Sequence, residues 1–182
     1  MIITYHPIIF RPLKSLTFSD PQQESLLRLA QAGISVYSPH TAVDATIGGV
    51  NDWLADCISG GRKYEVSREV IEAVAGPEGF ENSGMGRIVV LQQQAKLGQL
   101  EARVKVNLGM ERLMVADGSA GRGLKKIAVC AGSGGGLFKG LEVDVLFTGE
   151  LSHHAALAAK EKGISVISCE IHLPTTLLIA AH

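Results

Sequence analysis

Five of the six histidines stand shortly after an apolar run, at places where strands of a parallel sheet would end. His6 follows the run Ile2–Tyr5, and His40 follows Ile34–Tyr37, with Asp44 four residues further on. The others are His153, His154 and His172, whereas His182 is the last residue. Because the carboxyl ends of parallel strands share one edge of a sheet, we expect these side chains on one rim. Imidazole and carboxylate ligands together suit zinc, iron, manganese or nickel.

Simpler interpretations of the same residues stay open. A single histidine at a strand end is more often a surface or capping residue than a ligand. Neighbouring helical residues point about 100° apart, so His153 and His154 cannot both face one ion. Asp44 could cap the helix expected to begin near Gly48. Spacing alone therefore leaves a metal site and ordinary polar strand ends as alternatives.

The glycine-rich stretch VCAGSGGGLF (residues 129–138) is a second candidate site. A glycine turn between a strand and a helix can present backbone N–H groups to a phosphate. The dinucleotide pattern GxGxxG fails because Leu137 stands where its last glycine belongs, and no Gly-Lys-Ser/Thr of a Walker loop follows. A plain tight turn is the alternative.

The elements that would position these residues alternate between strands and helices. Ser19-Asp20-Pro21 is typical of a helix start, and Gly33 of its end. Residues 66–75 fit a helix or a strand equally well. Further predicted elements are a helix from Gly48, a tight turn at 84–87, a strand at 88–91 and a helix from Leu97 to Leu108 that Gly109 ends.

The last third of the chain has the clearest pattern. We predict strands at 127–131, 144–148 and 164–168, a short helical piece at 137–141 and an alanine-rich helix at 150–162. The order predicts an α/β fold with a mixed, largely parallel sheet flanked by helices. We expect one domain over residues 1–182, with a short insert or subdomain around 59–86.

Composition limits the function classes. The 182 residues are 46% hydrophobic, with a mean hydropathy of +0.21 and a net charge of −1. The sequence lacks a basic field, so we expect no direct nucleic-acid binding. It also lacks an apolar run of about 20 residues and a signal peptide, so we expect a cytoplasmic protein without a membrane partner. Cys130 and Cys169 lie in apolar runs and are expected to be buried thiols in a reducing compartment.

Five motifs, taken in order, resemble one family. They are TYHPIIFRP, SPHTAVDATIGGVNDWLA, NSGMGR, VCAGSGG and VLFTGELSHHAALAAKEKGISVI. Together they resemble the GTP cyclohydrolase type-two / Nif-three-like family, and Tyr-His in place of the bacterial His-His resembles its eukaryotic members. The resemblance implies an α/β fold, a centre of one or two divalent metal ions in a cleft, and a homo-oligomer, a hexamer or a trimer.

The resemblance also implies roles for individual residues. His6, Asp44 and His172 correspond to metal ligands, and His154 and His40 to cleft residues that would act as general acid or base. Tyr5 stands where bacterial members have a ligand.

Both ends of the sequence differ from the family pattern. The chain begins directly on the strand before His6, where the family has a further segment. His172 is displaced by one residue, and Thr176 stands where a glutamate is expected, which leaves Glu170 as the nearby carboxylate. We therefore expect a product truncated at both ends relative to the family.

Two functions follow from these observations. The first is a metal-dependent hydrolase of a small, nucleotide-like substrate, in which a bound ion lowers the pKa of water toward about 7. The alternative is a non-catalytic oligomeric scaffold that contacts transcriptional regulators. A metal-free domain that binds phosphate at GSGGG is a third interpretation.

Overall fold

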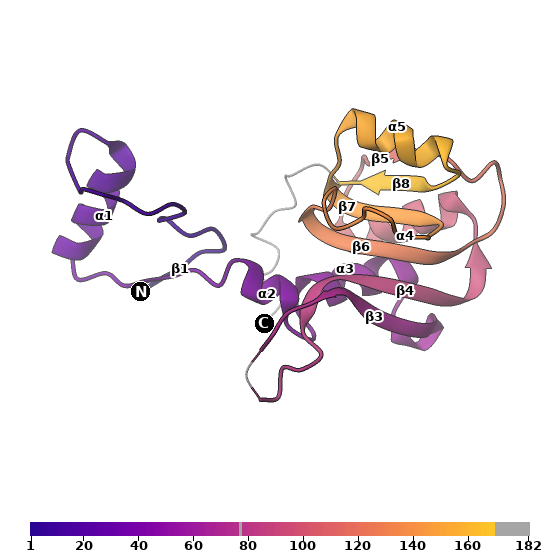
Figure 1. Ribbon diagram of the computed structural model, residues 1–182, viewed down its shortest axis with the longest axis horizontal. Coiled ribbons are helices and arrows are strands. Elements are labelled where there is room, and N and C mark those ends of the chain that lie inside the picture. Colours follow the sequence, from indigo (N-terminus) through magenta and orange to yellow (C-terminus); the bar gives the residue numbers. More distant parts are fainter. Residues whose placement is uncertain (77, 170–182) are drawn as a thin grey trace. The chain divides into compact units, whose positions relative to one another are not determined.

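The computed structural model describes residues 1–76 and 78–169. The chain divides into two compact units, one of Met1–Val43 and one that begins at Asp44, and each is described by itself. Figure 1 labels most of their helices and strands. Within the described residues, no helix combines the length and apolarity that crossing a bilayer requires. The expected single domain and the insert around 59–86 stay predictions.

The first unit is a small strand–helix–strand arrangement. Strand β1 (Ile2–Ile3) pairs in parallel with β2 (Val36–Tyr37), and α1 (Pro21–Gln31) connects them. Asp20 caps α1, because its carboxylate accepts hydrogen bonds from the backbone N–H groups of Gln22 and Gln23. The predicted helix start and the parallel pair are thus confirmed. The short helix α2 (Thr41–Ala45) crosses the boundary between the units.

The second unit is built on a six-stranded sheet in the order β3-β4-β6-β7-β8-β5. Its strands are β3 (Glu65–Ala73), β4 (Gly84–Ala95), β5 (Met114–Ala116), β6 (Leu124–Ser133), β7 (Val145–Glu150) and β8 (Ser165–Ser168). Its helices are α3 (Val50–Ser59), the 3-10 turn η1 (Arg62–Tyr64), α4 (Leu97–Leu108) and α5 (His153–Glu161). The predicted mixed sheet flanked by helices is confirmed. The parallel pairings are β6–β7 and β7–β8, a smaller share than expected.

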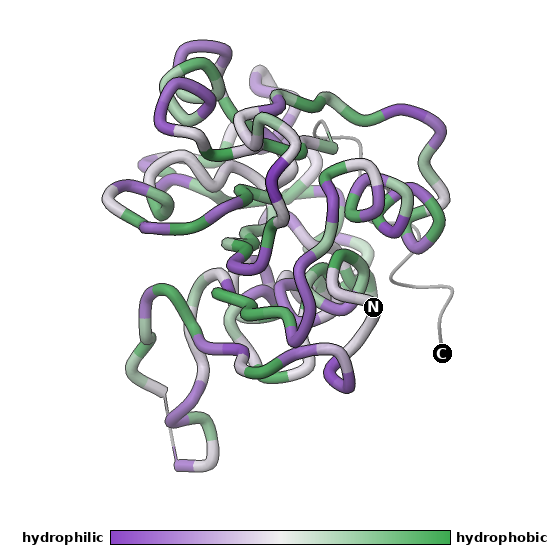
Figure 2. The backbone as a smooth tube through the Cα atoms, turned by 90° about the vertical axis from the view of Figure 1, so that its right-hand side faces the viewer, coloured by the Kyte–Doolittle hydropathy of each residue, from purple (hydrophilic) through white to green (hydrophobic). Residues whose placement is uncertain are grey.

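Both faces of this sheet are covered, which explains why its strands are apolar without alternation. Helices α3 and α4 pack together, and α3 packs against β4 and β6, whereas α5 packs against β8 and β5. On one face, Ala128, Cys130, Leu146 and Val166 form a cluster with Phe138 and Ala159. The alternate residues Ile127, Val129, Val145 and Phe147 are 0–1% exposed. In Figure 2, green apolar stretches recur between purple ones along the elements.

The predicted turn at 84–87 is wrong, because these residues begin strand β4. Gly86 has a φ of +64°, and a Cβ there would lie 2.6 Å from Leu137 and 2.7 Å from Ile71. Its glycine therefore serves close packing inside a strand. The predicted helical piece at 137–141 is also wrong, because residues 137–140 form turns and residue 141 is irregular. The ambiguous stretch 66–75 lies largely in β3, whose partner is β4.

A buried charge network joins α3 to β3 and β4. Arg87, 2% exposed, donates hydrogen bonds to both carboxylate oxygens of Asp52 at 2.9 and 3.0 Å and to the carbonyls of Gly84 and Gly86. Arg68 bonds the same Asp52, Asp56 and Glu65. Burial alone raises the pKa of Asp52, but hydrogen bonds from Arg87 and Gly48 outweigh it, so the pKa lies below its usual value. The network was not predicted, because it depends on residues up to 35 positions apart.

Candidate functional site

In the first unit, three polar rings gather where β1 and β2 end. The ring centroids of His6 and His40 lie 5.7 Å apart, and Tyr5 lies 4.8 Å from His6 and 5.7 Å from His40. The parallel pairing of Ile2 with Val36 and of Ile3 with Tyr37 places the following residues side by side. The predicted convergence of these two strand ends is therefore present in the structure. His6 is exposed and His40 is half-buried.

The backbone at His40 is fixed in an unusual conformation. Its φ is +45°, in the left-handed region that costs a non-glycine residue about 1 kcal/mol or more. Its N–H donates to the carbonyl oxygen of Tyr5 at 3.1 Å. This bond ties the segment after β2 to the segment after β1. The imidazole of His40 is thus held beside Tyr5 and His6 by the main chain.

Asp44 lies in α2 and is 3% exposed. Burial and, secondly, the charge of Asp44 raise the pKa of the Cys130 thiol to about 11, which places this carboxylate near the end of β6. The predicted cap at α3 is wrong, because its first residue follows Gly49 without a side-chain cap. Instead, Gly48 N–H donates to Asp52. Asp44 is thus a buried carboxylate, and a role as the cap of α3 does not explain why it is buried.

Asn51, which sequence reasoning missed, ties Asp44 to the sheet. Its amide nitrogen donates to the carbonyl oxygen of Asp44 at 2.9 Å, and its amide oxygen accepts from Ala131 N–H at 2.8 Å. Asn51 is fully buried on α3. The available signal was a polar residue on the apolar side of a predicted helix. The backbone around Asp44 is therefore positioned by the carboxyl end of β6.

The neighbouring strand β7 ends in Thr148 and Glu150. The hydroxyl of Thr148 donates to the carbonyl of Gly132 at 2.9 Å and accepts from Gly134 N–H at 3.1 Å. Glu150 pairs in register with Ser133, and its buried Oε1 has no hydrogen-bond partner among the described residues. A buried carboxylate oxygen of this kind is one that a cation or a proton would satisfy. Glu150 thus offers one such oxygen here, whereas the hydroxyl of Thr148 is already occupied by backbone groups.

The histidines of α5 are placed less favourably. His153 and His154 occupy the first turn behind the cap Ser152, and both are exposed. Their ring centroids are 6.1 Å apart with a tilt of 64°. His172, Glu170 and Thr176 lie outside the described residues. The ligand role of His172 and the acid–base roles of His154 and His40 stay predictions.

The expectation of one shared rim needs a correction. Strands β1 and β2 form their own two-stranded sheet, whereas β7 and β8 belong to the six-stranded sheet. Convergence of strand ends is therefore expected for His6 and His40, which follow strands of the same sheet. It is not expected for histidines that follow strands of different sheets. Within residues 1–76 and 78–169, no group of three or more His, Cys, Asp or Glu side chains is arranged to hold a metal ion. The proposed pairing of His6 with Asp44 joins residues of different units.

The glycine loop is explained by packing. A Cβ at Gly134 would lie 2.5 Å from the ring of Phe138 and 2.9 Å from the hydroxyl of Thr148. Glycine is required there because the chain turns tightly over β7. The plain-turn interpretation therefore accounts for this position without a phosphate.

These features define the chain as an α/β protein with a mixed sheet whose polar side chains follow the strand ends. The model of the family Duf34/NIF3 (NGG1p interacting factor 3) matches residues 1–175, and the chain belongs to this family. The predicted family resemblance is thus confirmed.

Three relatives and one solved structure illustrate the match. The chain is 49% identical to the protein NIF3 homolog of Schizosaccharomyces pombe, covering 92% of this chain and 60% of the relative. It is 44% identical to the NGG1-interacting factor 3 of Saccharomyces cerevisiae, covering 93% and 61%. It is 35% identical to a GTP cyclohydrolase 1 type 2 homolog of Lactococcus lactis, covering 85% and 56%.

The crystal structure of a Bacillus cereus protein related to NIF3 superimposes with a TM-score of 0.73 at 20% identity, covering 94% of this chain and 72% of that one. At this identity the likeness supports the fold. The chain spans about three fifths of the length of the S. pombe and S. cerevisiae relatives.

Proposed function

We propose that this protein binds a divalent metal ion, zinc, iron, manganese or nickel, through His6 and Asp44, and hydrolyses a small, nucleotide-like substrate. The observation that carries the proposal is the convergence of His6 and His40, with ring centroids 5.7 Å apart at the paired ends of β1 and β2. Two imidazoles from separate segments, one on a strained backbone, are typical of a functional site rather than of packing.

Asp44 follows His40 by four residues in the sequence and belongs to the second unit. Asp44 is buried and its backbone is held by Asn51, which gives it a fixed location. An imidazole and a carboxylate are a ligand combination that borderline divalent ions accept. A second ion, and His172 as a further ligand, belong to the proposal.

A bound ion would supply a water molecule with a pKa near 7 and would polarise the scissile group. The chain's own residues would hold and move protons. His40, half-buried beside Tyr5, is the candidate general base, and His154 at the start of α5 is the candidate acid. The L. lactis relative is named a GTP cyclohydrolase 1 type 2 homolog, which supports a nucleotide-like substrate.

Metal content separates the ligands from other histidines. We expect the purified protein to contain divalent metal by elemental analysis, and His6→Ala and Asp44→Asn each to lose most of it. His153→Ala, which removes an exposed imidazole outside the ligand set, serves as the matched control and should retain the metal. Hydrolysis of purine nucleotides should stop with a chelator and return when metal is restored. A folded protein that contains no metal and binds none from a mixture of the four ions would refute the proposal.

A non-catalytic role in protein interaction is the second candidate. The S. cerevisiae relative is named an NGG1-interacting factor, and large apolar side chains of the first unit are exposed, among them Ile3, Phe10, Phe18 and Tyr37. Where such side chains form a contiguous patch, they mark a contact with another protein chain. The partners would be transcriptional regulators and further copies of this chain, in a trimer or a hexamer in the cytoplasm. Light scattering would give the oligomeric state. A monomeric protein that retains metal-dependent turnover would favour the hydrolase function over the oligomeric scaffold.

A further inference from the structure

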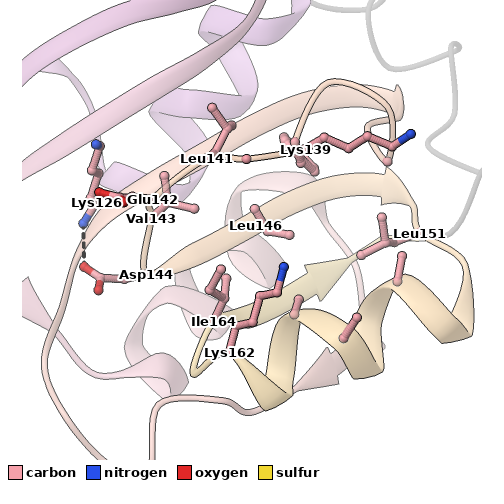
Figure 3. Close-up of a pocket in the computed structure, with 16 residues that line it drawn as sticks. Lys126, Lys139, Leu141, Glu142, Val143, Asp144, Leu146, Leu151, Lys162 and Ile164 are labelled. Atoms are coloured by element: carbon pink, nitrogen blue, oxygen red, sulfur yellow. Dashed lines mark hydrogen bonds between the residues drawn. The ribbon is translucent and has the colours of Figure 1, made fainter.

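An open groove runs over one face of the six-stranded sheet, between α5 and the turn segment 135–143. Its volume is about 1040 Å³. Its floor is apolar and includes Leu141, Val143, Leu146 and Ile164, with Ala155 and Ala158 of α5 along one side. Figure 3 labels Leu141, Val143, Leu146 and Ile164 among the side chains that line the groove. The volume is at the upper limit of about 300–1,000 Å³ for small-molecule pockets, so the groove has room for a large ligand.

The charges around this groove are unbalanced. Lys126, Lys139 and Lys162 line it, and their ammonium groups form no ion pair with any residue that the structure describes. Figure 3 shows Lys139 on the turn segment and Lys162 on the side of α5. Of the two acids, Asp144 is occupied by Arg122 and by the N–H groups of Lys125 and Lys126. Lysines therefore outnumber the one remaining acid, Glu142, so the groove complements a ligand with negative charges.

Backbone pairing restricts the form of the occupant. The floor belongs to β7 and its neighbours, and β7 is hydrogen-bonded to β6 on one side and to β8 on the other. A peptide cannot add to this sheet as a strand at the groove, because both edges of β7 are already paired. An α-helix satisfies its own backbone and needs no free strand edge, and the helix-in-groove mode uses an apolar floor of this kind.

We propose that this groove binds an amphipathic helix of a partner protein, whose apolar side chains contact Leu141 and Ile164 and whose flanking carboxylates face Lys139 and Lys162. This inference goes beyond the proposed metal site, because no groove residue belongs to it. It identifies a surface for a protein partner and the chemistry of that partner: leucine-like residues at positions i, i+3, i+4 and i+7 with glutamate or aspartate beside them.

Fluorescence anisotropy with designed peptides tests this surface on the full chain. The probe is a labelled 16-residue amphipathic helix with four leucines on one face and four flanking glutamates. Control peptides have the same composition in scrambled order, or lysine in place of each glutamate. We expect saturable binding of the acidic helix, and binding at least about tenfold weaker for both controls.

Protein variants locate the binding. The double variant Lys139→Glu/Lys162→Glu should weaken it about tenfold, and Lys160→Glu, a charge reversal on the same helix outside the groove, should not. Ala158→Gln, which adds bulk at an exposed groove position, should also weaken it, whereas Leu157→Gln, on α5 but outside the groove, should not. Circular dichroism would confirm that each variant is folded.

Several results would overturn the proposal. Equal binding of the acidic and the basic peptide would remove the charge argument, and binding unchanged in Ala158→Gln would place the site elsewhere. Displacement of the probe by a synthetic peptide of residues 170–182 would make the chain's own segment the occupant. A dimer in light scattering that Ala158→Gln dissociates would make a second copy the occupant. Absence of any peptide binding to the folded protein would also refute it.

Discussion

The two units of the chain differ in what they contain. Among the described residues, every buried apolar side chain stands at Ala45 or later in the sequence. Helix α1 of the first unit has no buried residue, and β1 and β2 pair over two residues each. Yet His6 and His40, the pair with the strongest sign of function, belong to this first unit. In this protein, the region with the most candidate chemistry is therefore separate from the region that supplies the stability.

The largest predicted difference between the two units is the loss of stability when an apolar side chain is truncated. Phe147 on β7 is 1% exposed, so Phe147→Ala should lower the free energy of unfolding by about 3–5 kcal/mol. Leu27→Ala in α1, where the side chain is half-buried, should lower it by about 1 kcal/mol or less. Urea denaturation followed by far-ultraviolet circular dichroism, which reports the helices of both units, measures both, and the fluorescence of Trp53 on α3 reports the second unit by itself. Equal losses would mean that the first unit contributes as much to folding as the second.

Ion pairs should show the same difference at a smaller scale. Arg87→Ala removes two of the hydrogen bonds to the buried carboxylate of Asp52 and should cost about 3 kcal/mol. Arg28→Ala in α1 removes an exposed pair with Glu24 at 2.7 Å and should cost about 0.5 kcal/mol or less. The same denaturation experiment compares them. A cost for Arg87→Ala as small as that for Arg28→Ala would show that the buried network adds little.

Acid should weaken the second unit through Asp52. Its pKa is lower in the folded protein than the value of about 3.9 in an unfolded chain, so its stabilising effect is complete above pH 4. That contribution falls as the pH drops below 4 and is lost once the pH is below the folded pKa. Stability measured between pH 6 and 3 should therefore fall less steeply in Asp52→Asn. An unchanged slope would show that other carboxylates control the acid response.

Local signals predicted the helices well. Helix α4 begins at Leu97 and ends at Leu108, as its apolar spacing and Gly109 indicated, and Gly109 has a φ of +64°. Helix α5 begins at His153 rather than at 150, because Glu150 completes strand β7 and Ser152 caps the helix. Strand β5 was not predicted, because its three residues are defined only by pairing with β8. Local sequence patterns thus located most helices and strands, whereas pairing with strands distant in the sequence determined where some of them begin and end.

The candidate site also combines features that local sequence patterns predict with features that depend on distant residues. The approach of His6 to His40 followed from two strands joined by one helix, an arrangement that short-range patterns contain. The allocation of those strands to a separate sheet did not, because sheet membership depends on distant partners. Asn51, Thr148 and Glu150 were missed for a related reason. Their role depends on the backbone of residues 131–134 and on Asp44, and no sequence spacing specifies those contacts.

Asn51 imposes an evolutionary constraint of its own. The nitrogen of the planar amide donates a hydrogen bond to one main-chain carbonyl. The amide oxygen accepts a hydrogen bond from a main-chain N–H group that is 80 residues away in the sequence. An aspartate carboxylate can only accept hydrogen bonds, and leucine can neither donate nor accept them. Glutamine is one methylene too long for the enclosed space. A replacement at this position would therefore demand simultaneous rebuilding of two distant segments, whereas a change at an exposed surface position would not.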